Sequence, residues 1–327
     1  MKLLGCKLFL TLLLTLCALT ARAADFHVNC GRVGQGLNTI AAALAKISEK
    51  AKHQALGPNT ITVTGACVEN VNIASLDNLT LQASSTGASI SDASNGTLDT
   101  VAVGDSNRFA LNGFTINGSV DCFDNAVCRL AGNTIQDSQV GYGLRASRSM
   151  IDSQKDSIIN NPSGVGVLVG NQSRVLLIDD IVSNNGASGI QAFDAGFVQL
   201  SAISSTTTVS NNAENGIVAT AHGTVRISVA NITGNGLDGI RVLNGSVLRM
   251  DFAAPNVNKV TGNAASGVNL GDLSHAFFAP DGSVNISGNL SGLDVYCAGQ
   301  FSATRNVGAV GGTTNCLEPN PNTPKHK

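Results

Sequence analysis

The stretch VSNNGASGI at residues 182–190 decides the fold, because the chain repeats its pattern. The pattern is an aliphatic residue, Ser or Thr, any residue, Asn, three further residues, Gly and an aliphatic residue. It recurs as VSNNAENGI at 209–217, ITGNGLDGI at 232–240 and VTGNAASGV at 260–268. Less regular copies lie on both sides, and the interval between copies is 23 to 28 residues. A period of this length is typical of a repeat architecture.

Each repeat contains three short segments in which apolar and polar residues alternate, separated by Gly, Asn or Asp turns. Residues 216–219 (GIVA) and 223–227 (GTVRI) show two of them. A unit of about 25 residues cannot bury an apolar face alone, so it must stack on copies of itself. We therefore predict an all-β parallel β-helix with about ten three-strand coils. The repeats lack the helical segment and the Leu spacing of a leucine-rich-repeat horseshoe.

The Asn column of the repeat predicts a structural ladder at one corner of the coils. Asn tolerates left-handed turn geometry, and its amide can hydrogen-bond to the neighbouring coil. The predicted ladder consists of Asn161, Asn185, Asn212, Asn235, Asn263 and Asn289.

The ends of the chain differ from the repeats and suggest four regions. Residues 1–23 read as a signal peptide, with a basic start, an apolar stretch and a small-x-small cleavage site. Residues 24–60 form an N-terminal segment in which Thr39 to Lys52 is expected to be a capping helix, with Asn38 as N-cap. Residues 61–300 form the β-helix, and residues 301–327 a C-terminal loop and polar tail.

Charge and cysteine content indicate the compartment. Removing residues 1–23 takes away three basic residues, so the formal net charge falls from −2 to −5. Nucleic acid is therefore not an expected partner, and no other apolar run is long enough for a transmembrane anchor.

Six cysteines remain and fit disulfides in a secreted or periplasmic protein, while the absence of a C-x2-C pair argues against zinc. Their spacing suggests the pairs Cys30 with Cys67, Cys122 with Cys128, and Cys297 with Cys316, although six cysteines allow 15 connectivities.

These features resemble the pectin-lyase-like superfamily of right-handed parallel β-helices. The resemblance covers residues 26 to about 300, including Cys30-Gly31, the TIAAAL stretch at 39–44, the segment 61–71 and the Asn-Gly-Ile coils. It implies a right-handed coil. Relatives include pectate lyases, polygalacturonases, alginate-modifying enzymes and non-enzymatic surface proteins, so function must come from a site.

The enzyme signatures of that superfamily are incomplete here. The chain has no Trp, so the W-x-D-H signature of pectate lyases is absent. Polygalacturonase motifs are echoed only by Asp180 in a D-D pair, His222 before Gly223, and Arg241 in place of R-I-K. These three residues are the catalytic candidates. The resemblance leaves open a polysaccharide lyase, a glycoside hydrolase or no catalysis. A lyase would imply Ca²⁺ held by carboxylates, and no other cofactor is indicated.

Alignment of the coils places arginines in two outward columns. Arg226 and Arg249 lie one above the other with Gln199 below, and Arg145, Gln191 and Arg241 occupy a second column. Stacked guanidinium groups can bind carboxylates or sulfates, although they can equally form a solvated face.

With no Trp and two Tyr, the chain has few aromatic faces for neutral sugars. We expect a secreted monomer that binds or modifies an acidic polysaccharide. The alternative is a non-catalytic surface, matrix or adhesion scaffold.

Overall fold

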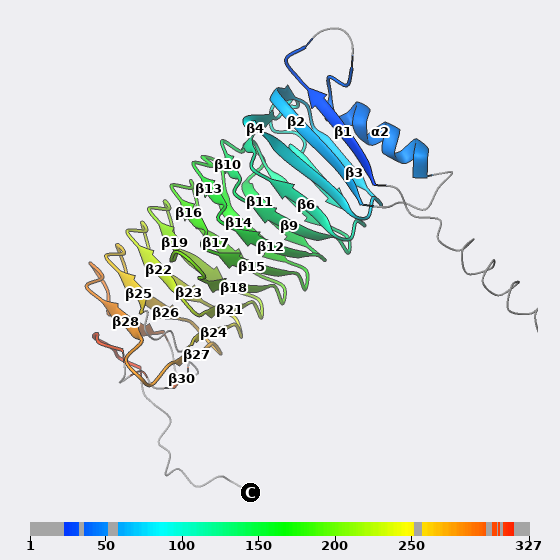
Figure 1. Cartoon of the computed structure of the whole chain (residues 1–327). Helices are drawn as coiled ribbons and strands as arrows, with labels where there is room; N and C mark the ends of the chain where they lie inside the picture. The colour runs from blue at the N-terminus through cyan, green and yellow to red at the C-terminus, as the bar shows by residue number, and fades with distance from the viewer. Residues whose placement is uncertain are drawn as a thin grey trace, which may run out of the picture.

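The computed structural model describes residues 23–32, 36–51, 58–251, 257–298, 303–305, 307 and 310–316. All but the last residue of the predicted signal peptide, and the predicted tail from Glu318 to Lys327, lie outside the described residues. Within these ranges the chain winds into coils that stack along one axis (Figure 1). Successive coils are joined by parallel strand pairs, so the predicted all-β parallel β-helix is confirmed.

Each regular coil contributes one strand to each of three faces. Face 1 is a 10-stranded parallel sheet. It consists of β3 (Val71–Ala74), β5 (Val101–Gly104), β8 (Val120–Phe123), β11 (Tyr142–Ser147), β14 (Val165–Gly170), β17 (Ile190–Ala192), β20 (Ile217–Ala219), β23 (Ile240–Val242), β26 (Val268–Leu270) and β29 (Val295–Cys297).

Faces 2 and 3 follow face 1 along each coil and belong to one larger sheet. Face 2 consists of β6 (Phe109–Asn112), β9 (Val127–Ala131), β12 (Met150–Gln154), β15 (Arg174–Ile178), β18 (Phe197–Ser201), β21 (Thr224–Ile227), β24 (Val247–Met250), β27 (His275–Phe278) and β30 (Ala303–Arg305). Face 3 consists of β7 (Thr115–Asn117), β10 (Thr134–Gln136), β13 (Ser157–Ile159), β16 (Ile181–Ser183), β19 (Thr207–Ser210), β22 (Ala230–Thr233), β25 (Asn258–Thr261) and β28 (Val284–Ser287).

The core lies between the three faces, because the strands alternate inward apolar and outward polar residues. In β15 and β18 the inward side chains of Val175, Leu177, Val198 and Leu200 are 0% exposed. Each such side chain contributes about 1.5–3 kcal/mol when it is fully buried, so the aliphatic rows drive the stacking.

The N-terminal end is closed by one more strand than the sequence predicted. The long strands β2 (Asn59–Val68) and β4 (Leu79–Ser91) pair with each other, and β4 pairs with both β6 and β7. β1 (Ala24–Asn29) then pairs in parallel with β2. The sequence pattern places this segment only in the N-terminal region before the helix. A single six-residue strand outside the repeat carries no periodic signal.

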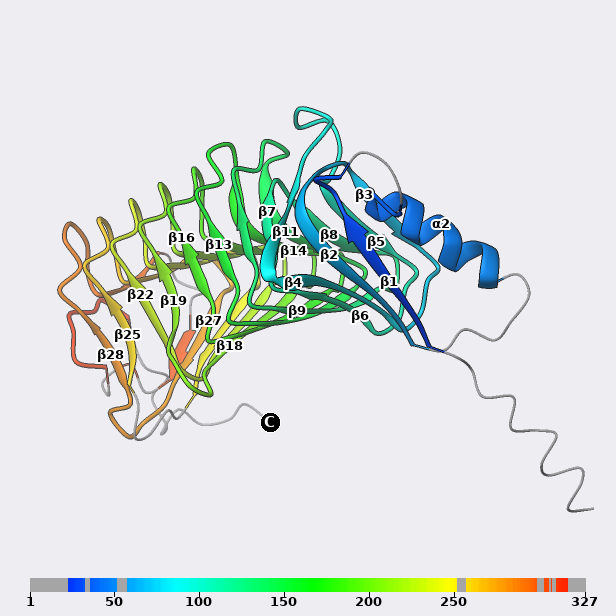
Figure 2. The ribbon, with the colours of Figure 1, turned by 45° about the horizontal axis from the view of Figure 1, so that its top comes forward.

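The predicted capping helix is confirmed as α2 (Ile40–Ala51), which lies over the end of the stack beside β1 and β2 (Figures 1 and 2). Its buried residues include Ile40, Leu44 and Ile47. The prediction of Asn38 as N-cap was wrong. The Ala42 N–H donates instead to Thr39 Oγ1 at 3.1 Å.

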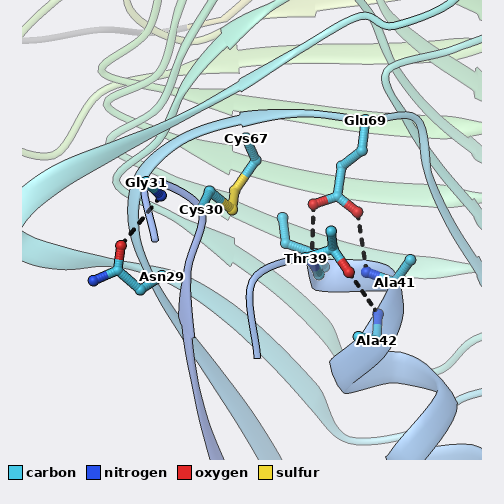
Figure 3. Close-up of a disulfide and its surroundings, with 9 residues drawn as sticks. Asn29, Cys30, Gly31, Thr39, Ala41, Ala42, Cys67 and Glu69 are labelled. Carbon is cyan, nitrogen blue, oxygen red and sulfur yellow. Dashed lines mark hydrogen bonds between the residues drawn. A yellow bond between two sulfur atoms is a disulfide. The ribbon is translucent and has the colours of Figure 1, made fainter. Parts of the chain in front are cut away.

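A carboxylate from the first coil completes the cap of α2 (Figure 3). Glu69 accepts the Ile40 N–H at 2.8 Å and the Ala41 N–H at 3.0 Å. A negative charge is favourable at a helix N-terminus, where backbone N–H groups lack partners within the helix. The disulfide between Cys30 and Cys67 lies next to this contact.

Three disulfides join the pairs that the spacing suggested. Besides Cys30 with Cys67, Cys122 in β8 pairs with Cys128 in β9, and Cys297 in β29 pairs with Cys316. They lie at the first coil, at a turn between faces 1 and 2, and at the last coil. Disulfides fit an extracellular or periplasmic protein. No helix in the described part of the chain is both long and apolar enough to cross a membrane.

The Asn column forms a continuous amide ladder at the corner between faces 3 and 1. Each Nδ2 group donates to Oδ1 of the next Asn at 2.8–2.9 Å, from Asn161 to Asn289, and Asn289 donates to Asp294 Oδ1 at 3.0 Å. The backbone N–H of each Asn donates to the same oxygen. The five amides from Asn161 to Asn263 are at most 1% exposed, so these bonds satisfy polar groups that water cannot reach.

We predict that Asn212→Ala lowers the free energy of unfolding by about 3 kcal/mol, because it leaves buried donors and acceptors of Asn185, Asn235 and Val182 without a partner. Denaturant unfolding followed by circular dichroism measures the change. Asn231→Ala, at an outward half-buried position of β22, is the matched control and should cost less than about 0.5 kcal/mol. Equal losses in the two variants would contradict a stabilising ladder.

Candidate functional site

A pocket of about 470 Å³ opens on face 1 near the N-terminal end of the stack. It is lined by residues of β3, β5, β8 and β11, and by the loop before β5 that carries Leu98 and Asp99. Outward positions of adjacent strands align here, since Asp121 of β8 is in register with Ala102 of β5 and Arg145 of β11. Side chains one coil apart are therefore direct neighbours.

Arg145 is the central side chain of the pocket. Its guanidinium donates from Nε to Asp121 Oδ1 at 2.9 Å and from Nη2 to Asp121 Oδ2 at 2.5 Å. The same Nη2 lies 3.8 Å from Asp99 Oδ2. The guanidinium also lies 4.6 Å from the centroid of the Tyr142 ring. Arg145 thus lies between two carboxylates, and its side chain keeps 36% exposure.

Among the residues that the structure describes, the Asp99 carboxylate accepts hydrogen bonds at Oδ1 only. Its Oδ1 accepts hydrogen bonds from the Tyr142 hydroxyl at 2.8 Å and from Ser119 Oγ at 2.7 Å. Its Oδ2 is the oxygen that lies toward Arg145. Tyr142 is 5% exposed and does not line the pocket, so it orients Asp99 from behind.

The loop that carries Asp99 is anchored by Asp92. The Asp92 carboxylate accepts hydrogen bonds from Ser94, from the Gly96 N–H and from Asn70 Nδ2. Asn70 Nδ2 also donates to the Asp99 carbonyl at 3.0 Å. Burial raises the pKa of Asp92, but the hydrogen bonds from Ser94, Asn70 and Gly96 outweigh it and lower the pKa to about 2. The loop is thus tied to the first coil by a charged acceptor.

Burial sets the electrostatics of the pocket. It raises the pKa of Asp121 above the ordinary value, although the hydrogen bonds and charge of Arg145 act in the opposite direction. Burial and the hydrogen bond to Asp99 raise the pKa of Tyr142, so its phenol stays protonated at neutral pH. The hydrogen bonds to Asp121 raise the pKa of Arg145 despite burial, so this group stays charged. The cluster therefore offers a ligand a fixed cation and carboxylate oxygens, while the Tyr142 hydroxyl stays hydrogen-bonded to Asp99.

Arg148 provides a second, looser cation at the edge of the pocket. It pairs with Asp124, and the two side chains are 62% and 40% exposed. Exposed ion pairs contribute about 0–1 kcal/mol, so a ligand anion can replace Asp124 at little cost.

A family model described as a right handed beta helix region matches residues 64–253, more than half of the chain. The chain belongs to the right-handed β-helix family. This membership confirms the predicted handedness and the resemblance to pectin-lyase-like β-helices. No curated protein has a matching sequence.

Two solved structures share the fold of this β-helix protein. The A-module of the mannuronan C-5 epimerase AlgE4 from Azotobacter vinelandii aligns with a TM-score of 0.56 and 14% identity, over 85% of this chain and 94% of that one. The A-module of AlgE6 from the same organism aligns with a TM-score of 0.58 and 15% identity, over 90% and 97%. At these identities the likeness concerns the fold alone.

The β-helix does not bring the three catalytic candidates together. Asp180 is 0% exposed and lies at the corner between faces 2 and 3, where it accepts the Asp156 N–H at 2.7 Å and the Ile178 N–H at 3.1 Å. Its assignment as a catalytic candidate was therefore wrong, because a carboxylate in the interior cannot contact a polysaccharide. The D-D pair marks a buried turn.

His222 and Arg241 lie elsewhere on the β-helix. His222 occupies the turn between β20 and β21 with φ 64°, and its ring lies under Gly245 of the next coil. Arg241 is an exposed residue of β23 on face 1. It belongs to the same outward column as Arg145, several coils away. The two residues form no common site with Asp180.

The proposed ligand-binding residues lie on face 2 in the register that the repeat implied. Gln199 pairs with Arg226, and Arg226 pairs with Arg249. Cys30, Cys67 and Glu69 are close enough to hold a metal, but the sulfurs are bonded to each other and Glu69 caps α2.

The repeat pattern predicts Arg145 in an outward column but not its partners Asp121 and Asp99. Asp121 precedes Arg145 by one repeat, so the coil spacing could have found this pair. Asp99 could not be found in this way, because it lies in an insertion without the repeat pattern.

The buried corner that contains Asp180 predicts a pH effect on stability. Burial, together with the charge of Asp156, raises the pKa of Asp180 to about 8, and burial raises that of Asp156 to about 6. The unfolded chain loses these protons near pH 4, whereas the folded chain keeps them. Stability should therefore fall as pH rises from 6 to 8, by up to about 1.4 kcal/mol per pH unit for one proton.

We predict that Asp180→Asn flattens this decline, because an amide does not titrate. Denaturant unfolding at pH 6, 7 and 8 measures it, and Asp152→Asn at an exposed position of β12 is the control. If stability declines as steeply with pH in Asp180→Asn as in the wild type, the pH effect does not come from the Asp156–Asp180 pair.

Proposed function

We propose that this protein is secreted and binds an acidic polysaccharide across face 1, where the Arg145 pocket acts on a uronic acid residue. The observation that carries the proposal is the position of Arg145 between Asp99 and Asp121 in an open pocket of a β-helix. Mannuronan epimerases, whose modules have the same fold, act on such a polymer. The scarcity of aromatic residues, with two Tyr and no Trp, also favours an anionic over a neutral ligand.

The two arginines would bind the substrate carboxylate. Arg145 stays charged and partly exposed, and Arg148 is held only by an exposed ion pair. Guanidinium groups bind carboxylates through two parallel hydrogen bonds. A bound carboxylate also makes the neighbouring C–H more acidic when its charge is neutralised.

Asp99 is the group placed to accept that proton. Its Oδ1 is occupied by Tyr142 and Ser119, which leaves Oδ2 as the oxygen available on the pocket side. Transfer of a proton from the carbon next to the substrate carboxylate to Asp99 Oδ2 is the first step of both elimination and epimerisation. In elimination the electron pair left on the carbon then expels the glycosidic oxygen, which takes a proton from solvent. In epimerisation a solvent proton adds to the same carbon from the opposite face. In both reactions Asp99 finally releases its proton to solvent.

The resemblance to pectate lyases suggested Ca²⁺, but the carboxylates of this pocket do not fit a calcium site. Both oxygens of Asp121 accept hydrogen bonds from Arg145, and Oδ1 of Asp99 accepts two others. Calcium needs six to eight oxygen ligands, several of them free carboxylate oxygens. We therefore assign neutralisation of the substrate charge to Arg145 and Arg148.

We predict that the protein exchanges the proton next to the carboxylate of polymannuronate or polygalacturonate with solvent deuterium, as measured by NMR in D₂O. Unsaturated product in the ultraviolet would identify elimination, and a changed uronate composition would identify epimerisation. Asp99→Asn should reduce the rate by at least about 100-fold, because it removes the proton acceptor. Arg148→Gln should mainly weaken substrate binding.

Asp152→Asn, which removes an exposed carboxylate of face 2, should leave the rate unchanged. If the protein neither exchanges this proton nor binds any polymer in a panel of uronate polymers, the proposal is refuted and the non-catalytic scaffold is favoured.

A further inference from the structure

A second group of charged residues lies on face 2, away from the pocket. Arg226 of β21 and Arg249 of β24 are in register on adjacent coils. Both donate from Nε to one carboxylate, that of Asp251, which directly follows β24. We call these three residues the arginine clamp.

The clamp fixes two guanidinium groups in one orientation. Within the described part of the chain, Nε of each arginine is bound to Asp251, so the Nη groups form the edge that remains for a ligand. The arginine side chains are 43% and 62% exposed, whereas Asp251 is 13% exposed. Asp251 therefore lies beneath the two cations, and a ligand at the surface meets the arginines first.

Electrostatics keep the clamp intact and positive. Burial alone would raise the pKa of Asp251, but hydrogen bonds and charges from Arg226 and Arg249 hold it below the ordinary value. Two cations share one anion, so the clamp carries a net charge of about +1 in a chain with a formal charge of −2.

The spacing of the clamp is set by the fold. Residues in register on adjacent parallel strands are about 4.8 Å apart, which is close to the length of one sugar residue in an extended polymer. The same outward column continues to Gln199 of β18 on one side and to Phe277 of β27 on the other. Phe277 is 37% exposed. A linear chain along the axis would thus meet an amide, two guanidinium groups and an aromatic edge in turn.

We propose that the arginine clamp is a binding site for a linear anionic polysaccharide, which uses one carboxylate or sulfate per sugar to contact Arg226 and Arg249 in turn. The site does not depend on the pocket, because the two lie on different faces of the coil stack. This site holds the protein on the polymer and catalyses no reaction.

The test is electrophoresis through gels that contain dextran sulfate or neutral dextran, which carry no uronate. Dextran sulfate, but not dextran, should retard the wild type. In Arg226→Gln/Arg249→Gln the apparent dissociation constant should rise at least about tenfold, since two charge-assisted contacts are lost. Lys259→Gln, which removes an exposed cation from β25 on face 3, is the control and should bind as the wild type.

Two further variants sharpen the outcome. Asp251→Asn makes the surface more positive but releases the guanidinium groups, so weaker binding supports a positioning role for Asp251, and equal or tighter binding overturns it. Arg249→Gln alone alters a largely exposed side chain and should show a smaller loss even if the double variant is unstable. Unchanged retardation of folded Arg226→Gln/Arg249→Gln would overturn the site, as would equal competition by double-stranded DNA.

The experiment also separates this site from the proposed function. Asp99→Asn should leave retardation by dextran sulfate unchanged, since the pocket is not involved. Absence of uronate exchange by the wild type, together with intact retardation, would refute the pocket alone.

Discussion

Vertical hydrogen bonding between coils is the constraint on which the rest of this structure depends. Parallel backbone pairing fixes the register of each strand on the strand below, and the buried amide ladder fixes the corner at which each coil turns. A shift of one coil by one residue would break several of these hydrogen bonds at once. Each buried amide left without a partner costs about 1–3 kcal/mol, so such shifts are strongly unfavourable. The repeat length is therefore free to vary only where a turn can absorb residues.

This constraint converts sequence distance into spatial proximity. Residues separated by one repeat become neighbours on the same face, as Asp121 and Arg145 do on face 1 and Arg226 and Arg249 do on face 2. The same rule stacks Asp156 beside Asp180 in the interior, where each carboxylate accepts a hydrogen bond from a backbone N–H group. These charged residues thus lie in vertical pairs, and their effect depends on whether they point inward or outward.

Inward and outward charged side chains have different pKa values because only the outward ones are in contact with solvent. Desolvation raises the pKa values of Asp156 and Asp180, so that corner loses stability as pH rises toward 8. At the surface, Asp251 is held ionised by two arginines that remain accessible to a ligand. The pocket lies between these extremes, since Asp121 is buried against Arg145 while Arg145 itself stays partly exposed.

The sequence by itself determined the parallel β-helix, the Asn ladder, the capping helix and the register of Arg226 on Arg249, because all of these follow from a repeat or from local periodicity. It could not determine that Asp180 is buried, since an acidic pair before a strand reads the same at a surface turn and at an interior corner. Nor could it place Asp99 beside Tyr142 and Arg145, because Asp99 lies in an insertion whose path depends on contacts of Asp92 and Asn70 with other coils. Only the tertiary structure decided these positions, because each depends on side-chain contacts outside the repeat rather than on the period of the chain.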